Sequence, residues 1–374
     1  MVNFSSMHKY MVIGTMKIFL RELLEKNMEN QMIDGQNIER KKEFDYARGI
    51  AICLVVLGHM TTYPRIARQF IYSFHMPLFF ILSGITFSLS QENNTSIFLK
   101  KRINSIIIPA YFFELVMYVW QIVKNCFEHT YSRISLIRRF LGIVLQIGYS
   151  DYTGSLWFLF TLFLALMIAH FILVKQKRNF QIVFAFICLV SSYLFCNYYN
   201  DVYLVWHFEV VPLAVFYICF GYWISKILKK KLSRLTFFNS TLVFLGLGFV
   251  MFFSFDINFA FDSHSFGNVF TDVATAILFS AAIICFSMFL SQGNKTYKIL
   301  EFIGKNSMSI YGIQAIMVGI LNTIIWHLFD EKVLYSGRGY LISLVSFVIS
   351  MIADCLFCHI YNKYIKKHLP LIKS

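Results

Sequence analysis

Charge is scarce in this chain of 374 residues. Asp, Glu, Lys and Arg together make up 14% of it, whereas hydrophobic residues make up 57% and aromatic residues 18%. A soluble domain ordinarily carries about 25% charged residues, which cover its surface. The composition excludes a disordered chain, a collagen-like repeat and a secreted disulfide scaffold. It favours an all-α, polytopic membrane protein embedded in the lipid bilayer over a soluble enzyme.

Linkers and several familiar motifs are also missing. Proline occurs five times, and no Pro-rich or Gly/Ser-rich stretch divides the sequence. No P-loop, GxGxxG, HExxH or GxSxG pattern occurs, which argues against an ATP-driven pump and a standard hydrolase. We therefore predict one membrane domain over residues 43–362. We expect a cytoplasmic N-terminal segment at residues 1–42, which has neither the apolar core nor the cleavage site of a signal peptide. We expect a basic cytoplasmic tail at residues 363–374.

The eight cysteines give no sign of a metal centre. Most lie inside apolar runs, where cysteine behaves as a small buried hydrophobe. Cys355, Cys358 and His359 are closely spaced, but a zinc site needs a fourth ligand and none is evident nearby. We predict that the protein binds no metal.

Ten apolar runs are long enough, at about 20 residues, to cross a bilayer as helices. They lie at roughly 47–63, 70–90, 103–124, 155–174, 180–199, 210–228, 236–255, 270–291, 306–328 and 340–362. A further apolar stretch at 134–149 contains Arg138 and Arg139, so we interpret it as interfacial or re-entrant.

The basic residues follow this alternation of spans. With the N-terminus inside, 25 of the 34 Lys and Arg residues fall in cytoplasmic segments and eight in outer segments, and Arg48 lies within the first run. This asymmetry follows the positive-inside rule and predicts that both termini are cytoplasmic. It also accounts for the net charge of +14 without a nucleic-acid partner.

The first run contains two ionisable residues, Arg48 and His59. Eleven residues of helix make about three turns plus ~20°, so both face the same side, about 16 Å apart. Each costs roughly 2.5–3.5 kcal/mol to place in a membrane. Arg48 alone fits a snorkelling anchor and His59 alone an interfacial histidine, but their shared face favours a functional site.

A third ionisable residue, His75, opens the second run and lies at a similar depth to His59. Two histidines at one level in adjacent helices suggest a proton-handling or substrate site, and Pro77 can kink the helix there. We predict a substrate-binding role for four residues, which are His75, Glu114, Trp157 and Glu209. The alternative for Glu114 is a structural hydrogen bond to a neighbouring helix. The same alternative applies to three weaker candidates, which are His170, Asp272 and Asp354. For Trp157 the alternative is an ordinary position at the membrane interface.

These motifs resemble the acyltransferase 3 family of integral-membrane acyltransferases, in its sugar O-acetyltransferase branch. The first span opens with an Arg-x10-His pattern, as in that family. The other stretches that carry the resemblance, which extends over residues 43–360, are Phe74-His75-Met76-Pro77-Leu78-Phe79-Phe80 with Ser83-Gly84, Lys101-Arg102 before Ile108-Pro109-Ala110-Tyr111, Ser155-Leu156-Trp157-Phe158-Leu159, and Ile303-Gly304-Lys305-Asn306-Ser307-Met308-Ser309-Ile310-Tyr311.

Two positions depart from the family's pattern. Ser105 stands where the family often carries a second arginine in the basic stretch, and Ile313-Gln314 stands where the late motif often ends in histidine. Both departures concern the contacts with the acyl donor more than the chemistry at His59.

The resemblance implies transfer of an acyl group, usually acetyl, from cytoplasmic acetyl-CoA to a sugar hydroxyl of a surface or lipid-linked glycan. His59 is then the base or a transient acyl carrier, since histidine has an ordinary pKa near 6.5. His75 supports it or binds acceptor hydroxyls. Arg48, Lys101 and Arg102 are expected to hold the donor's phosphates. Two alternatives stay open, which are a glycan or lipid transporter (flippase) and a non-catalytic scaffold.

Overall fold

The computed structural model describes most of the membrane domain. The described residues are 41–60, 64–90, 92–127, 132–147, 156–199, 201–228, 232–255, 257, 267–334 and 336–365. The expected cytoplasmic N-terminal segment and tail therefore lie almost entirely outside the described residues, and their boundaries stay predictions.

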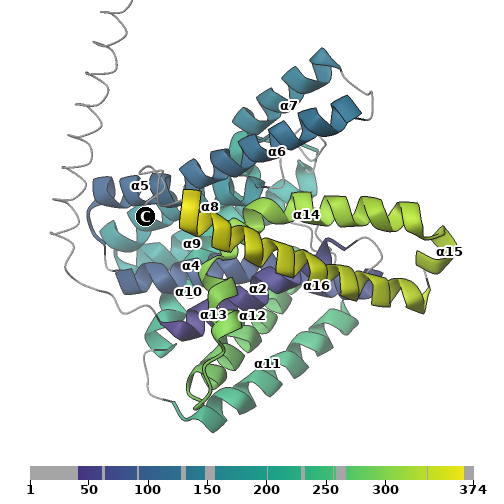
Figure 1. The fold of residues 1–374 in the computed structure, drawn as a ribbon. Coiled ribbons are helices and arrows are strands. Elements are labelled where there is room, and N and C mark those ends of the chain that lie inside the picture. The colour runs from purple at the N-terminus through teal and green to yellow at the C-terminus, as the bar shows by residue number, and fades with distance from the viewer. Residues whose placement is uncertain are drawn as a thin grey trace, which may run out of the picture. The chain divides into compact units, whose positions relative to one another are not determined.

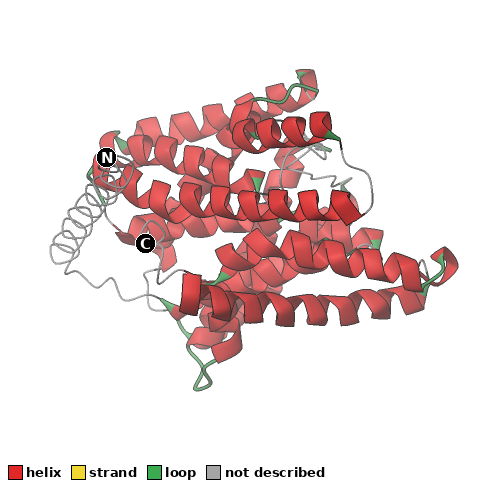
Figure 2. Ribbon diagram, turned by 45° about the horizontal axis from the view of Figure 1, so that its top comes forward, coloured by secondary structure: helices red, strands yellow, loops and turns green. Residues whose placement is uncertain are grey.

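The described residues form helices and no strand (Figures 1 and 2). In chain order the helices are α2 (Lys42–Gly58), α3 (Arg65–Tyr72), α4 (His75–Ser90), α5 (Thr95–Arg102), the π-helical η1 (Ile103–Ile107), α6 (Ile108–Phe127), α7 (Arg133–Leu145), α8 (Trp157–Lys175), α9 (Arg178–Tyr198), the 3-10 helix η2 (Val205–Val210), α10 (Val211–Leu228), α11 (Arg234–Ser254), α12 (Val269–Ser291), α13 (Lys298–Lys305), α14 (Ser307–Leu328), α15 (Glu331–Leu334), α16 (Gly337–Ile360) and the π-helical η3 (Tyr361–Ile365).

Nine helical segments within the described ranges are long and apolar enough to cross a membrane. They coincide with the second to tenth expected runs, and they confirm the prediction of an all-α polytopic membrane protein. The first expected run corresponds to α2, which has 17 residues and ends at Gly58 rather than at residue 63. At 1.5 Å per residue α2 is about 25 Å long, slightly shorter than the ~30 Å core of a bilayer.

The short helix α7 lies beside α6 and runs antiparallel to it (Figure 1). The hydroxyl of Tyr118 donates to the carbonyl oxygen of Leu136 at 3.3 Å, and that of Tyr111 donates to Val144 at 3.3 Å. Later residues of α6 thus contact earlier residues of α7. α7 therefore returns along the preceding span, and the interpretation of residues 134–149 as interfacial or re-entrant stays a prediction.

The central helices α4 and α10 cross at two glycines. A Cβ atom on Gly84 would overlap the carbonyl oxygen of Ile218, and one on Gly221 would overlap that of Ile81. Beyond the crossing the hydroxyl of Ser225 donates to that of Ser88 at 2.7 Å. Small residues let helix backbones approach closely in membranes, where packing rather than burial from water drives association. The crossing holds α4, which carries His75, against the core.

Large apolar side chains are exposed along the outer helices, for example Phe253 on α11 (70% exposed) and Leu356 on α16 (61%). In water such surfaces would favour aggregation, whereas in a bilayer they face lipid. Of the polar residues discussed below, His75, Glu114, His207 and Glu209 are buried inside the helix assembly.

Candidate functional site

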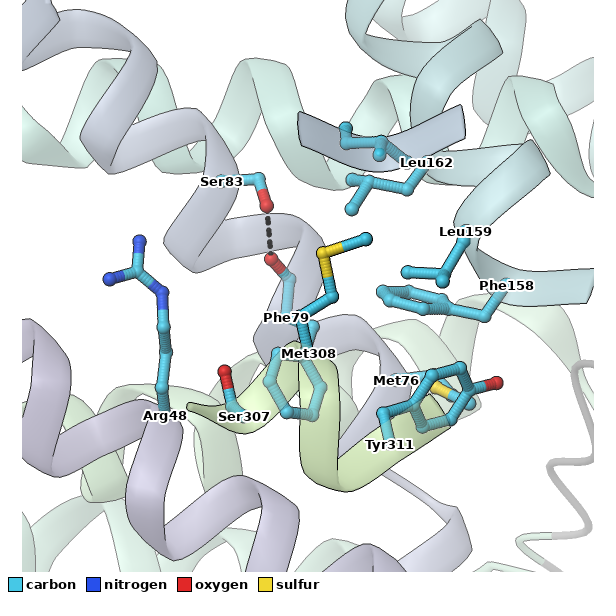
Figure 3. A pocket seen from close by; sticks show the side chains of 11 residues that line it. Arg48, Met76, Phe79, Ser83, Phe158, Leu159, Leu162, Ser307, Met308 and Tyr311 are labelled. Carbon is cyan, nitrogen blue, oxygen red and sulfur yellow. Dashed lines mark hydrogen bonds between the residues drawn. The ribbon is translucent and has the colours of Figure 1, made fainter. Parts of the chain in front are cut away.

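A partly open cavity of about 120 Å³ lies among α2, α4, η1, α8 and α14. Figure 3 shows Arg48 on one side of it and the apolar side chains of Phe158 and Leu159 on the other. Ser83, Ser307 and Tyr311 bring the other polar groups of the lining, and the hydroxyl of Ser83 donates to its own helix, to the carbonyl oxygen of Phe79 at 2.8 Å. We call this cavity the Arg48 pocket. It is a narrow apolar space with a cation at its edge.

The Arg48 pocket follows one face of α4. Met76, Phe79 and Ser83 all line it, and seven helical residues span about 10 Å. Met76 is the neighbour of His75 in the sequence. The pocket therefore extends from the guanidinium of Arg48 to the level at which α4 begins.

Arg48 is held at the pocket by two polar contacts. Its guanidinium lies 3.4 Å from the carboxylate of Asp45 and 3.4 Å from the hydroxyl of Thr86, and its side chain is 23% exposed. Asp45 is fully buried. Arg48 thus contacts both its own helix, through Asp45, and α4, through Thr86.

Arg102 does not line the Arg48 pocket, but its charge lies close enough to that of Arg48 for the two to repel one another. Its guanidinium lies over the ring of Phe98, 4.8 Å from the ring centre, and its buried Nε has no hydrogen-bond partner. Phe98 is itself stacked on His170, with ring centres 4.3 Å apart. Two neighbouring guanidinium groups repel one another, so this end of the pocket is suited to an anion that would bind both.

Lys101, the residue before Arg102, contacts a different group. Its ammonium group lies 3.3 Å from the carboxylate of Glu92, and its side chain is exposed and does not line the Arg48 pocket. Ser105 lies in η1, and its neighbour Ile106 lines the pocket. The structure therefore brings Arg102, but not Lys101, to Arg48.

His59 and His75 lie on either side of Tyr72, at the other end of α2. The hydroxyl of Tyr72 is 3.4 Å from Nδ1 of His59, and the rings of Tyr72 and His75 are 5.1 Å apart. Nδ1 of His75 is 2.9 Å from the carbonyl oxygen of Ile71. His59 is exposed and His75 is buried. We call His59, Tyr72 and His75 the histidine cluster; it brings together the two histidines expected at one depth.

The other residues expected to bind substrate form a second polar group with Gln146 and His207. The amide of Gln146 donates to Glu114 at 3.2 Å, and the backbone next to Trp157, at Leu156, also hydrogen-bonds Glu114. The ring of Trp157 lies 5.3 Å from that of His207. Nδ1 of His207 is 3.0 Å from Glu209. We call Glu114, Gln146, Trp157, His207 and Glu209 the outer polar cluster.

Backbone strain gathers at the outer polar cluster. Gln146, Trp206 and His207 have φ values of 48°, 57° and 51°, and they are the non-glycine residues with positive φ in the described part of the chain. Such conformations cost of order 1–3 kcal/mol each and are concentrated at functional sites. Buried atoms without a hydrogen-bond partner lie here too, among them Oε2 of Glu114, Oε1 of Gln146 and Nε2 of His207. The cluster can therefore accept further polar contacts.

The weaker candidates lie apart from these groups or support them. Asp272 accepts a hydrogen bond from the backbone of Gly267 at 2.9 Å, near the start of α12, and Asp354 accepts one from Ser350 at 3.5 Å. His170 stacks on Phe98, beneath Arg102. His170 is thus linked to Arg102 through the ring of Phe98.

Sequence reasoning missed Tyr72, Gln146 and His207. Tyr72 is three residues before His75, a spacing that would place two side chains on one face of a continuous helix, although in the structure α3 ends at Tyr72 and α4 begins at His75. His207 is two residues before Glu209 at the entry of a span, so the rule that selected Glu209 could have included it. No local signal distinguishes Gln146.

Comparison with protein families identifies the chain. Residues 41–358 match the acyltransferase 3 model, described as an acyltransferase domain. Comparisons with curated proteins and with solved structures give no match. The matched range includes the Arg48 pocket and the histidine cluster. The chain therefore belongs to the acyltransferase 3 family, and the protein is a multi-pass membrane acyltransferase.

Proposed function

We propose that the protein transfers an acetyl group from acetyl-CoA to a hydroxyl of a sugar in a surface or lipid-linked glycan, in a bacterial-type cell membrane. The observation that carries the proposal is the shape and charge of the Arg48 pocket. It is apolar along α4 and has the guanidinium of Arg48 at one end, and the charge of Arg102, which does not line the pocket, lies close enough to interact with that of Arg48. Acetyl-CoA has the matching form, with anionic phosphates at one end and a slender thioester arm at the other.

The phosphates of the donor would bind between Arg48 and Arg102, which would relieve the repulsion between these cations. The pantetheine arm would then follow α4 past Phe79 toward Met76. The rise of about 16 Å along α2 between Arg48 and His59 is of the same order as the length of an extended pantetheine arm. The thioester would thus reach the level of the histidine cluster while the nucleotide stays at the cytoplasmic side.

His59 is proposed as the general base. Nε2 of a neutral imidazole takes the proton of the acceptor hydroxyl as the hydroxyl oxygen attacks the acetyl carbonyl carbon. The C–S bond breaks as the new C–O bond is completed, and the CoA thiolate takes the proton from the imidazolium. No proton is gained or lost overall. In the variant of this scheme His59 first carries the acetyl group itself.

The outer polar cluster is proposed to bind the acceptor. Its carboxylates, amide and imidazole can pair with sugar hydroxyls, and Trp157 and Trp206 offer aromatic surface for the face of a sugar ring. Trp157 is joined to the Arg48 pocket through its neighbour Phe158. His75 could bind an acceptor hydroxyl through Nε2, since its Nδ1 is engaged by Ile71.

The test uses purified protein in nanodiscs with radiolabelled acetyl-CoA, and follows binding and release of label to added glycans or to water. Arg48→Ala is expected to lose binding, and His59→Gln is expected to keep binding but lose turnover. His327→Gln is the matched control, because His327 is an exposed histidine on α14 whose Nδ1 lies 2.8 Å from a carbonyl oxygen of its own helix. Folded wild-type protein that does not bind acetyl-CoA would refute the proposal. A transport function would then be tested by flux assays.

A further inference from the structure

Tyr72 occupies the middle of the histidine cluster. Its hydroxyl lies 3.4 Å from Nδ1 of His59 and 3.4 Å from the carbonyl oxygen of Gly58. A phenol has one proton to donate and lone pairs that accept. Two arrangements are therefore possible, and they leave the proton of His59 on different nitrogens.

The first arrangement has Tyr72 donating to Gly58. The hydroxyl oxygen then accepts from Nδ1–H of His59, and Nε2 keeps its lone pair. In the second, Tyr72 donates to Nδ1, and the proton of the neutral imidazole is on Nε2, where it would block the uptake of a proton from an acceptor.

The end of α2 favours the first arrangement. Gly58 is buried and lies in the last turn of the helix, where carbonyl groups have no intrahelical donor. A buried carbonyl without a donor costs about 1–3 kcal/mol. His59 is exposed, so Nδ1 has less need of Tyr72 as a donor.

Two neighbouring features support the same arrangement. Gly58 lets the ring approach, since a Cβ atom there would lie 2.9 Å from Cε1 of Tyr72. In His75, Nδ1 must be the protonated nitrogen, because a carbonyl oxygen, that of Ile71, is its partner at 2.9 Å. Both histidines would then present an unprotonated Nε2.

We propose that Tyr72 is a positioning residue that holds the imidazole of His59 with its proton on Nδ1, leaving Nε2 as the base. This inference rests on the proposed function for its catalytic consequence, but the position of the proton can be measured without turnover. The hydrogen-bond chain runs from Nδ1–H of His59 to the Tyr72 hydroxyl and from there to the carbonyl of Gly58.

The test replaces Tyr72 by phenylalanine, which keeps the ring against Gly58 and His75 and removes the hydroxyl. We expect kcat to fall about 10- to 100-fold, less than the 10²–10⁴ that a general base contributes, with an unchanged KM for acetyl-CoA. Tyr118→Phe is the matched control, since Tyr118 makes a similar bond, of 3.3 Å to Leu136, away from the histidine cluster. The Tyr118→Phe variant should leave kcat unchanged.

The second readout is 15N NMR of protein labelled at its ten histidines, with the His59 signals assigned by their absence in His59→Gln. Wild-type protein should show a protonated Nδ1 at His59. Tyr72→Phe should shift the proton toward Nε2, and so should Gly58→Ala, which displaces the ring while keeping the hydroxyl.

An Nε2-protonated His59 in the wild type, or a tautomer unaffected by Tyr72→Phe, would overturn the inference whatever the activity. If folded wild-type protein fails to turn over acetyl-CoA, the proposed function fails, and the NMR result alone then decides whether Tyr72 positions His59.

Discussion

Removal of the Arg102 charge is the perturbation that most sharply separates a phosphate site from a merely structural arginine. Arg102→Gln keeps a polar side chain above Phe98 but removes the guanidinium group whose charge interacts with that of Arg48. A hydrogen bond to a charged group contributes about 1.5–3 kcal/mol. Since 1.4 kcal/mol is a factor of ten, we expect the Kd for acetyl-CoA to rise about 10- to 100-fold.

The assay compares acetyl-CoA with acetyl-pantetheine, which lacks the phosphates. Arg102→Gln should weaken the binding of acetyl-CoA and leave the binding of acetyl-pantetheine unaffected. Arg234→Gln is the matched control, because Arg234 also lies over a phenylalanine ring, 4.4 Å from the centre of Phe289, and does not line the pocket. The Tm of ligand-free Arg102→Gln should not fall further than that of Arg234→Gln, since Arg102 is repelled by Arg48. The phosphate site would be refuted if the variant bound both ligands equally more weakly, or if it bound both as tightly as the wild type.

Three further results are expected. His59→Gln should lower acetyl transfer by about 10²–10⁴ with little change in the Kd for acetyl-CoA, as measured by isothermal titration; a parallel loss of binding would contradict its role as base. His207→Gln should raise KM for the glycan and leave that for acetyl-CoA unchanged in steady-state assays, whereas a rise in both would place His207 outside an acceptor site. Gly84→Val should destabilise the protein by more than the ~1–3 kcal/mol of ordinary overpacking, because the new side chain would meet the backbone of α10. Gly246→Val, on α11, has open space around its Cβ position and should leave the thermal unfolding profile unchanged, so equal profiles for the two variants would contradict the tight crossing.

Hydropathy predicts the spans well because lipid allows few alternatives to a long apolar helix. It does not locate the end of α2, where the chain leaves the helix at His59 although the residues before it remain apolar. The structure places Arg48 in the first half of α2 and His59 directly after its last residue, and the shared face that helical periodicity suggests for them stays a prediction. The difference between Lys101 and Arg102 does not follow, because adjacent helical residues point about 100° apart and only the packed partner shows which one faces Arg48.

The outer polar cluster illustrates what the sequence hides. Its members are more than 90 residues apart at the extremes, and they meet because α7 returns along α6 and because η2 turns through left-handed backbone at Trp206 and His207. Such conformations are ordinarily signalled by glycine or asparagine. Tryptophan and histidine give no such signal, so Glu114 and Glu209 could be selected as candidates but not predicted to lie together.

The most direct test of the central claim is a cryo-electron microscopy structure of the protein in nanodiscs with acetyl-CoA. The account predicts phosphate density between Arg48 and Arg102, with the thioester arm along α4 and its acyl end at the histidine cluster. Density for the donor outside the Arg48 pocket, for instance beside Lys101 and Glu92, would contradict it.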